Sequence, residues 1–106
     1  MMKLIPAEMS AKLTLRKRNK KFNQIKKAAI RAIKSATKHG KYLVPINIPY
    51  DWTDVEFFAF WTYFTTQGYI LRTFGGDYWT NSEIAVKQYQ KYRFTTLVIS
   101  WEPKDA

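Results

Sequence analysis

The feature that most constrains this chain is an uninterrupted stretch, residues 19–38, that contains neither glycine nor proline. Alanine, lysine, glutamine and isoleucine dominate the stretch, and this composition favours helix. When its residues are placed at 100° intervals, the apolar side chains fall within one arc of roughly 100°, which is the face that a helix buries. That face consists of Phe22, Ile25, Ala29, Ala32, Ile33 and Ala36. The pattern predicts an amphipathic helix that ends at Gly40, and residues 7–15 either extend this helix or form a separate one before it.

The opposite side of the predicted helix carries cations and no acid. An arc of about 60° holds Lys20, Lys27, Arg31, Lys34 and Lys38. A dense cluster immediately upstream adds Arg16, Lys17, Arg18 and Lys21. Ordinary solvated faces mix both charge signs, because opposite charges four residues apart attract and like charges repel. The repulsion on this face predicts an anionic partner, with nucleic acid the leading candidate and a merely solvated face the alternative.

The 106 residues carry a net charge of +10, and this charge is unevenly placed. Residues 1–42 hold 13 Lys or Arg and one acid, Glu8, for a net charge of +12. The remaining residues hold five basic and seven acidic side chains, for a net charge of −2. This asymmetry predicts two parts. Residues 1–41 form a basic segment with the long amphipathic helix, and residues 42–106 form a small α/β domain packed against it.

After Gly40 the sequence predicts three strands and a second helix. The strands are residues 42–49, 69–74 and 94–101. The first contains two prolines and is therefore an edge or irregular strand, whereas the last is convincing through its β-branched residues. Thr53 and Glu56 form a capping box that begins the second helix, and Gly68 ends it. Residues 78–93 are ambiguous, because Ser82–Lys87 fits either a short helix or the arm of a hairpin.

This order of elements predicts an α+β fold. A long N-terminal helix precedes a two-layer β-α-β-β unit, in which helices cover one face of a three-stranded mixed sheet.

The second predicted helix is aromatic around nearly its whole circumference, whereas one helix on a small sheet buries a single stripe. We assign to the core the larger stripe, which consists of Phe57, Phe60, Trp61 and Phe64. The remaining aromatic residues, Trp52, Phe58 and Tyr63, are predicted to contact another chain, either a second copy or a neighbouring protein. Stacking of these rings on the bases of single-stranded nucleic acid is the alternative.

Few residues suit catalysis or metal binding. The chain has no cysteine and one histidine, which removes cysteine nucleophiles and thiolate zinc sites. Asp51, Asp54 and Glu56 lie close in sequence, and helix capping explains them better than metal binding or acid–base chemistry. His39 fits a solvated helix end, and residues 75–77 fit a turn, since the Lys-Ser/Thr of a P-loop is missing. We therefore expect no catalytic residue, no metal, no cofactor and no enzymatic activity.

Short motifs accompany this layout of elements. They are Ile25-x4-Ile30-x-Ala32, Gly40-Lys41-Tyr42, Gly68-Tyr69, Gly76-Asp77-Tyr78, and Thr95-Thr96 leading into Ile99-Ser100-Trp101. Over roughly residues 7–101, the chain resembles small, mostly uncharacterised tailed-bacteriophage proteins with a long N-terminal helix, a β-α-β-β domain and a terminal Ile-Ser-Trp strand. It departs from them in its aromatic second helix and in residues 79–91, which look like an insertion. The group has no assigned catalytic residues, so the resemblance implies a phage origin and no site.

These features predict a non-catalytic phage-type accessory protein that binds polyanions, nucleic acid above all, and associates with other subunits as a homo-oligomer. Two alternatives stay open. One is a virion component that assembles with capsid or tail proteins, and the other is a soluble phage inhibitor of a host defence protein or signalling nucleotide. The most apolar stretch, residues 55–74, is interrupted by polar residues, and the N-terminus lacks an export signal. We therefore expect the host cytoplasm or the virion, with no secretion, no transmembrane segment and no membrane partner.

Overall fold

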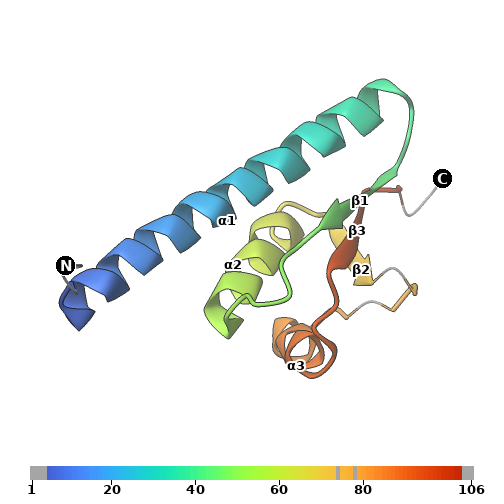
Figure 1. Cartoon of the computed structure of the whole chain (residues 1–106). Coiled ribbons are helices and arrows are strands. Elements are labelled where there is room, and N and C mark those ends of the chain that lie inside the picture. The colour runs from blue at the N-terminus through green and yellow to red at the C-terminus, as the bar shows by residue number, and fades with distance from the viewer. Residues whose placement is uncertain (1–4, 74, 78, 104–106) are drawn as a thin grey trace.

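A computed structural model describes residues 5–73, 75–77 and 79–103 (Figure 1). It confirms the α+β class, with a long N-terminal helix, a three-stranded sheet and two further helices. In chain order the elements are α1 (Ala7–Lys38), β1 (Leu43–Asn47), α2 (Asp54–Thr65), β2 (Ile70–Thr73), α3 (Ser82–Tyr92) and β3 (Thr96–Ser100). Phe74 of a predicted strand and Tyr78 of a quoted motif lie outside the described residues.

The first helix is continuous, so residues 7–15 extend the predicted helix rather than form a separate one. Its 32 residues span about 48 Å at 1.5 Å per residue. Gly40 ends it as predicted, because a backbone φ of +73° lets the following Lys41 N–H donate to the Ala36 carbonyl at 2.9 Å. The radius of gyration is 16.4 Å, against about 13 Å for a compact chain of this length. The first turns of α1 account for this excess because they project beyond the other elements (Figure 1).

The sheet is antiparallel throughout, not mixed as predicted. Its strand order is β1-β3-β2, so the last strand enters between the first two and runs opposite to both. One register row joins Val44 of β1, Ile99 of β3 and Leu71 of β2. The proline-containing β1 lies at an edge, as predicted, where a missing backbone N–H is tolerated.

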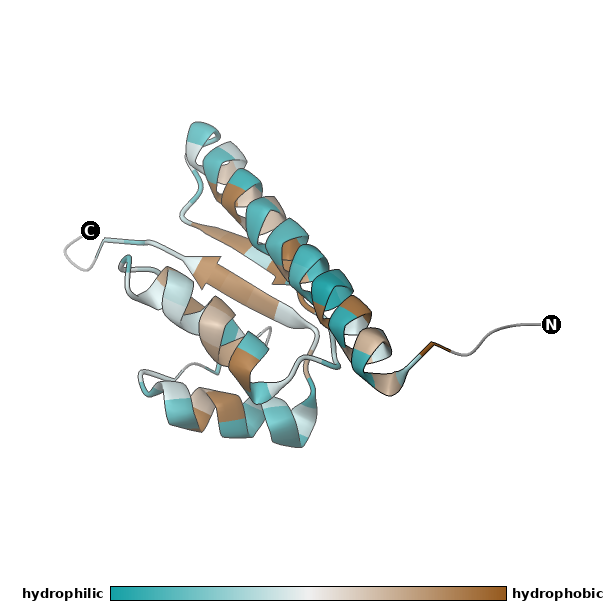
Figure 2. Ribbon diagram, turned by 90° about the vertical axis from the view of Figure 1, so that its left-hand side faces the viewer, coloured by the Kyte–Doolittle hydropathy of each residue, from teal (hydrophilic) through white to brown (hydrophobic). Residues whose placement is uncertain are grey.

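The ambiguous region before β3 forms the helix α3. Asn81 begins it, since its side-chain oxygen accepts hydrogen bonds from the backbone N–H groups of Glu83 and Ile84. The helix ends at Arg93, whose backbone is left-handed with a φ of +47°. All three helices lie on one side of the sheet (Figures 1 and 2). The architecture is therefore β-α-β-α-β after α1, one helix more than the sequence predicted.

The middle helix, α2, provides the centre of the core. The predicted core stripe is confirmed, because each of its members is at most 2% exposed: Phe57, Phe60, Trp61 and Phe64. Phe57 stacks on Tyr89 of α3 with ring centroids 4.5 Å apart, while Phe60 faces Phe22 of α1 at 6.5 Å. This one stripe of α2 meets α1, α3 and the sheet, and among the described residues of that helix no other is buried.

Trp52 corrects the prediction of a partner contact. The side chain is 3% exposed, with its ring between Phe22 at 5.5 Å and Phe60 at 5.1 Å. The loop before α2 passes under α1, and this path turns the indole into the core. Trp52 is therefore part of the contact between α1 and α2 and is not accessible to another chain.

Candidate nucleic-acid interface

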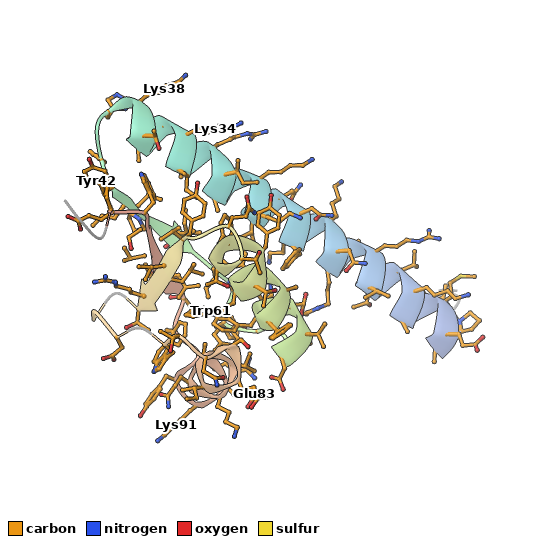
Figure 3. The ribbon with its side chains drawn as sticks, turned by 180° about the vertical axis from the view of Figure 1, so that it is seen from behind. Lys34, Lys38, Tyr42, Trp61, Glu83 and Lys91 are labelled. Carbon is orange, nitrogen blue, oxygen red and sulfur yellow. The ribbon has the colours of Figure 1, made fainter. Side chains whose placement is uncertain are left out.

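The cations predicted to contact nucleic acid lie on the outer side of α1, with one exception. We call the basic face the set Arg16, Lys17, Lys20, Lys21, Lys27, Arg31, Lys34 and Lys38. All eight side chains are exposed. Ala29, Ile33 and Ala36 are buried on the opposite side of the helix and fix its orientation. Figure 2 shows the hydrophilic side of α1 turned away from the sheet, and in Figure 3 Lys34 and Lys38 point away from the rest of the protein.

The electrostatics of the basic face are uncompensated. Among the described residues, no ion pair involves any of its eight cations. The sequence contains no acid between Glu8 and Asp51, so every turn of α1 after the first lacks a negative side chain. From Arg16 to Lys38 the cations extend over about 33 Å of a continuous helix. The cations thus follow a straight helix in two groups, one from Arg16 to Lys21 and one from Lys27 to Lys38.

Arg18 is the exception, because its side chain is half-buried and paired with acids of its own chain, so we no longer count it among the candidate nucleic-acid contacts. Its guanidinium forms ion pairs with Glu56, at 2.5 Å, and with Asp51, at 3.6 Å. It also donates a hydrogen bond to the Asp51 carbonyl oxygen at 2.9 Å. The hydrogen bond with Glu56 raises the pKa of Arg18. At 100° per residue Arg18 falls inside the apolar arc of the helix, and this signal in the sequence distinguishes it from its basic neighbours.

Glu56 joins α1 to the start of α2. The predicted capping box is confirmed, since the Glu56 carboxylate accepts from the Thr53 N–H at 2.9 Å and the Glu56 N–H donates to the Thr53 hydroxyl. Burial alone raises the pKa of Glu56, but the hydrogen bonds from Arg18 and Thr53 outweigh burial and hold that pKa below its ordinary value. The carboxylate is therefore charged at neutral pH and serves capping and ion pairing.

The helix α3 fixes the same loop from the other side. The buried Tyr89 hydroxyl donates to the Pro49 carbonyl at 2.5 Å and accepts from the Trp52 N–H at 3.0 Å. Burial raises the pKa of this phenol, so it stays protonated and can donate. Arg93 donates to the Trp52 carbonyl at 2.8 Å. Residues 49–53 are thus held between α1 and α3, and this arrangement fixes where α1 crosses the domain.

Phe58 and Tyr63 both lie outside the core, as the predicted core stripe requires, yet they differ in their surroundings. Phe58 is 46% exposed and lines a groove that residues of α3 also line. The Tyr63 ring lies 4.7 Å from the Lys26 ammonium of α1, in a cation–π contact, and also packs against Phe64. Sequence reasoning did not single out Lys26, which is half-buried at the edge of the apolar face. Contact of Phe58 or Tyr63 with another chain stays a prediction.

The residues considered for other chemistry have local structural partners. His39 Nδ1 lies 2.8 Å from the Ser35 carbonyl oxygen at the end of α1, and Asp77 N–H donates to the Thr73 hydroxyl in the turn after β2. Over the described ranges, no group of three or more His, Asp or Glu residues is arranged to hold a metal ion. No helix in that part of the chain is long and apolar enough to cross a membrane.

Comparisons with protein-family models, curated proteins and solved structures give no match. The resemblance to tailed-bacteriophage proteins therefore stays a prediction from short motifs.

Proposed function

We propose that this chain is a non-catalytic accessory protein that binds polyanions, and nucleic acid in particular, through the basic face of α1. The observation that carries the proposal is that all eight cations of this face are exposed and, among the described residues, none has an acidic partner. Like charges three and four residues apart repel, so the free protein carries an electrostatic cost that an anionic ligand relieves. The phage setting rests on the motif resemblance alone.

The shape of the basic face favours nucleic acid over a compact anion. Duplex DNA carries one negative charge per about 1.7 Å of its axis, and a straight row of cations about 33 Å long contacts several phosphates at once. Lysine predominates in the row and binds phosphate as a point charge. Phosphate contacts carry no sequence information, so we expect binding to duplexes of different sequence with equal affinity.

A salt titration tests the proposal. If Lys20, Lys27, Arg31, Lys34 and Lys38 contact phosphates, the slope of log affinity against log salt for duplex DNA is about −4 to −5, at roughly −0.9 per phosphate. Filter binding between low and physiological salt measures it.

A matched pair of variants separates the basic face from net charge. Lys27→Glu with Arg31→Glu reverses two cations four residues apart on α1, and we expect it to weaken binding to all sequences equally. The control, Lys87→Glu with Lys91→Glu, makes the same charge change at the same spacing on α3, and we expect a much smaller loss. Equal losses in both variants, or no binding to DNA or RNA at low salt, overturn the proposal.

A further inference from the structure

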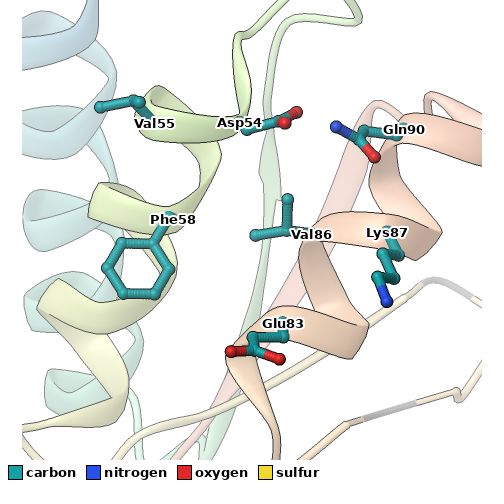
Figure 4. Close-up of a pocket in the computed structure, with 7 residues that line it drawn as sticks. All are labelled: Asp54, Val55, Phe58, Glu83, Val86, Lys87 and Gln90. Carbon is teal, nitrogen blue, oxygen red and sulfur yellow. The ribbon is translucent and has the colours of Figure 1, made fainter.

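A groove with an apolar floor separates α2 from α3. Its volume is about 420 Å³, and the apolar residues that line it are Val55, Phe58 and Val86. Figure 4 shows the Val86 side chain pointing from α3 toward α2 and the Phe58 ring lying along α2, with Asp54 near one end of the groove and Glu83 near the other. Lys87 lies on the outer side of α3. An acid at an end of the groove suits a segment in which an apolar pair is followed by cations.

The floor of this groove is accessible. Phe58 and Val55 are 46% and 77% exposed. Large apolar side chains gathered on one surface are typical of an interaction site, whereas isolated ones need no explanation. The groove therefore fits a partner, and its chemistry restricts which one.

The same chain carries a segment with the complementary pattern. We call the arm residues 7–17, the part of α1 that projects beyond the domain; every arm residue except Ser10 is exposed. Met9 and Leu13 are four residues apart and therefore lie on one side of the helix, both about half exposed. Arg16 and Lys17 follow on that side one turn later. The arm thus presents an apolar pair beside two cations.

We infer that the arm of a second copy of this chain docks in the groove between α2 and α3. Met9 and Leu13 contact the apolar side chains of the groove, and Arg16 and Lys17, which follow one turn later, approach the acid at one end of it, as an amphipathic helix binds a groove. The arm cannot reach the groove of its own chain, because α1 is one continuous helix without a glycine or proline at which it could fold back. Reciprocal docking of two arms gives a closed, two-fold symmetric dimer.

This inference does not depend on nucleic-acid binding. In the dimer Arg16 and Lys17 face acids of the partner, and the cations from Lys20 to Lys38 stay available to a polyanion. The inference also separates the two exposed aromatic residues of α2, because Phe58 lines the groove and Tyr63 lies against Lys26 of its own chain.

Two leucines of the arm supply a matched pair of variants. Size-exclusion chromatography with light scattering, on nuclease-treated protein, measures whether each variant forms the dimer. Leu13 lies on the proposed docking side, while Leu15 is 200° further round the helix and is 60% exposed. We expect the natural chain and Leu15→Asp to be dimers. Leu13→Asp and Phe58→Asp should each raise the dimer dissociation constant by about tenfold or more, because each buries a carboxylate in the apolar contact. Circular dichroism confirms that each variant is folded.

Cross-linking tests the contact itself, since the chain has no cysteine of its own. A Leu13→Cys protein mixed with a Phe58→Cys protein should form a disulfide between the two chains under mild oxidation. The Leu15→Cys protein in the same mixture should not. A natural chain that stays monomeric at all accessible concentrations overturns the inference. A dimer that Leu13→Asp and Leu15→Asp weaken equally, or one in which both cysteine pairs form at the same rate, also overturns it.

Discussion

The two parts of α1 are built from similar residues and differ in what surrounds them. Residues 7–17 project without a buried side chain, while residues 18–38 bury Ala29, Ile33 and Ala36 in the core. The boundary is Arg18, the first α1 side chain to form an ion pair with the rest of the molecule. Helix propensity alone therefore does not determine which turns of a helix pack against the rest of the protein. The packed part owes its stability to tertiary contacts, and the arm has only its own propensity until a partner binds.

The largest expected effect comes from breaking the core against which the packed part of α1 lies. Trp61 is 2% exposed, and its ring lies 6.0 Å from that of Phe57 and 6.5 Å from that of Trp79. We expect Trp61→Ala to lower the free energy of unfolding by about 3–5 kcal/mol, enough to unfold a small domain. Thermal and urea unfolding followed by circular dichroism measure this.

Phe58→Ala provides the comparison on the same helix. Because Phe58 lies outside the core, its truncation should leave the melting transition of the monomer nearly unchanged and weaken the dimer instead. If the two variants Phe58→Ala and Trp61→Ala show the same loss in the free energy of unfolding and both are monomeric, Phe58 is a core residue. The prediction that it contacts another chain is then wrong.

Most helices and strands could be predicted from local patterns. The 3.6-residue periodicity of α1, the Thr53–Glu56 capping box and the glycine at position 40 each specify a local structure through backbone chemistry. The core stripe of α2 followed from spacing alone. Eight of the nine predicted nucleic-acid contacts lie on one exposed side of α1, because charge and helical angle together decide exposure.

The rest depended on contacts between elements that are distant in sequence. Residues 78–93 contain no long periodic stretch, so the sequence leaves a short helix and a hairpin arm as alternatives there, and only the structure establishes α3. Trp52 precedes the second helix, so helical spacing does not place it, and its burial depends on the long-range contact with Phe22 of α1. The position of β3 between β1 and β2 is a property of the tertiary fold, which a strand count cannot supply. Arg18 was grouped with its neighbours by sequence, although its helical angle places it among apolar residues.

Truncating Arg18, the residue at the boundary between the two parts of α1, is expected to have a smaller effect on the free energy of unfolding. Arg18→Ala deletes the ion pairs with Glu56 and Asp51 and leaves a partly buried carboxylate without its guanidinium. We expect a loss of about 1–2 kcal/mol in the free energy of unfolding, since a charged hydrogen bond is lost at a partly exposed site. Lys17→Ala, on the exposed side of the same turn, is the matched control and should change stability little. Equal urea midpoints for the two variants would show that the Arg18 contact does not hold α1 to the domain.

The stability difference between the natural chain and Arg18→Ala should depend on pH if the ion pair of Arg18 with Glu56 causes it. The pKa of Glu56 is lower in the folded chain than in the unfolded one, so its contribution is fully present above the unfolded value of about 4.3 and is lost as pH falls through the folded value. We therefore expect the stability gap between the natural chain and Arg18→Ala to narrow as the pH is lowered below about 4.3. Urea unfolding at neutral pH and at acidic pH measures the gap. A gap that is constant across this range would assign the stabilisation to packing or to the hydrogen bond with the Asp51 backbone carbonyl, neither of which titrates.

The smallest effect on stability, and the most direct comparison of the two parts, is expected in amide hydrogen exchange along α1. Residues 25–38 belong to the part of α1 that packs one face against the core. Their amides should therefore exchange only when the core opens. The arm has no such contact, and a helical end of about three turns is marginal in water on its own. In the monomeric Leu13→Asp variant, amides of the arm should therefore exchange far faster than those of the packed part. In the natural chain, docking of the arm in a second copy should slow the exchange of the arm amides, and the slowing should increase with protein concentration.

Leu15→Asp is the control and should show the same dependence on concentration as the natural chain. Arm amides that exchange equally fast in all three proteins at every concentration would mean that the arm stays undocked in solution.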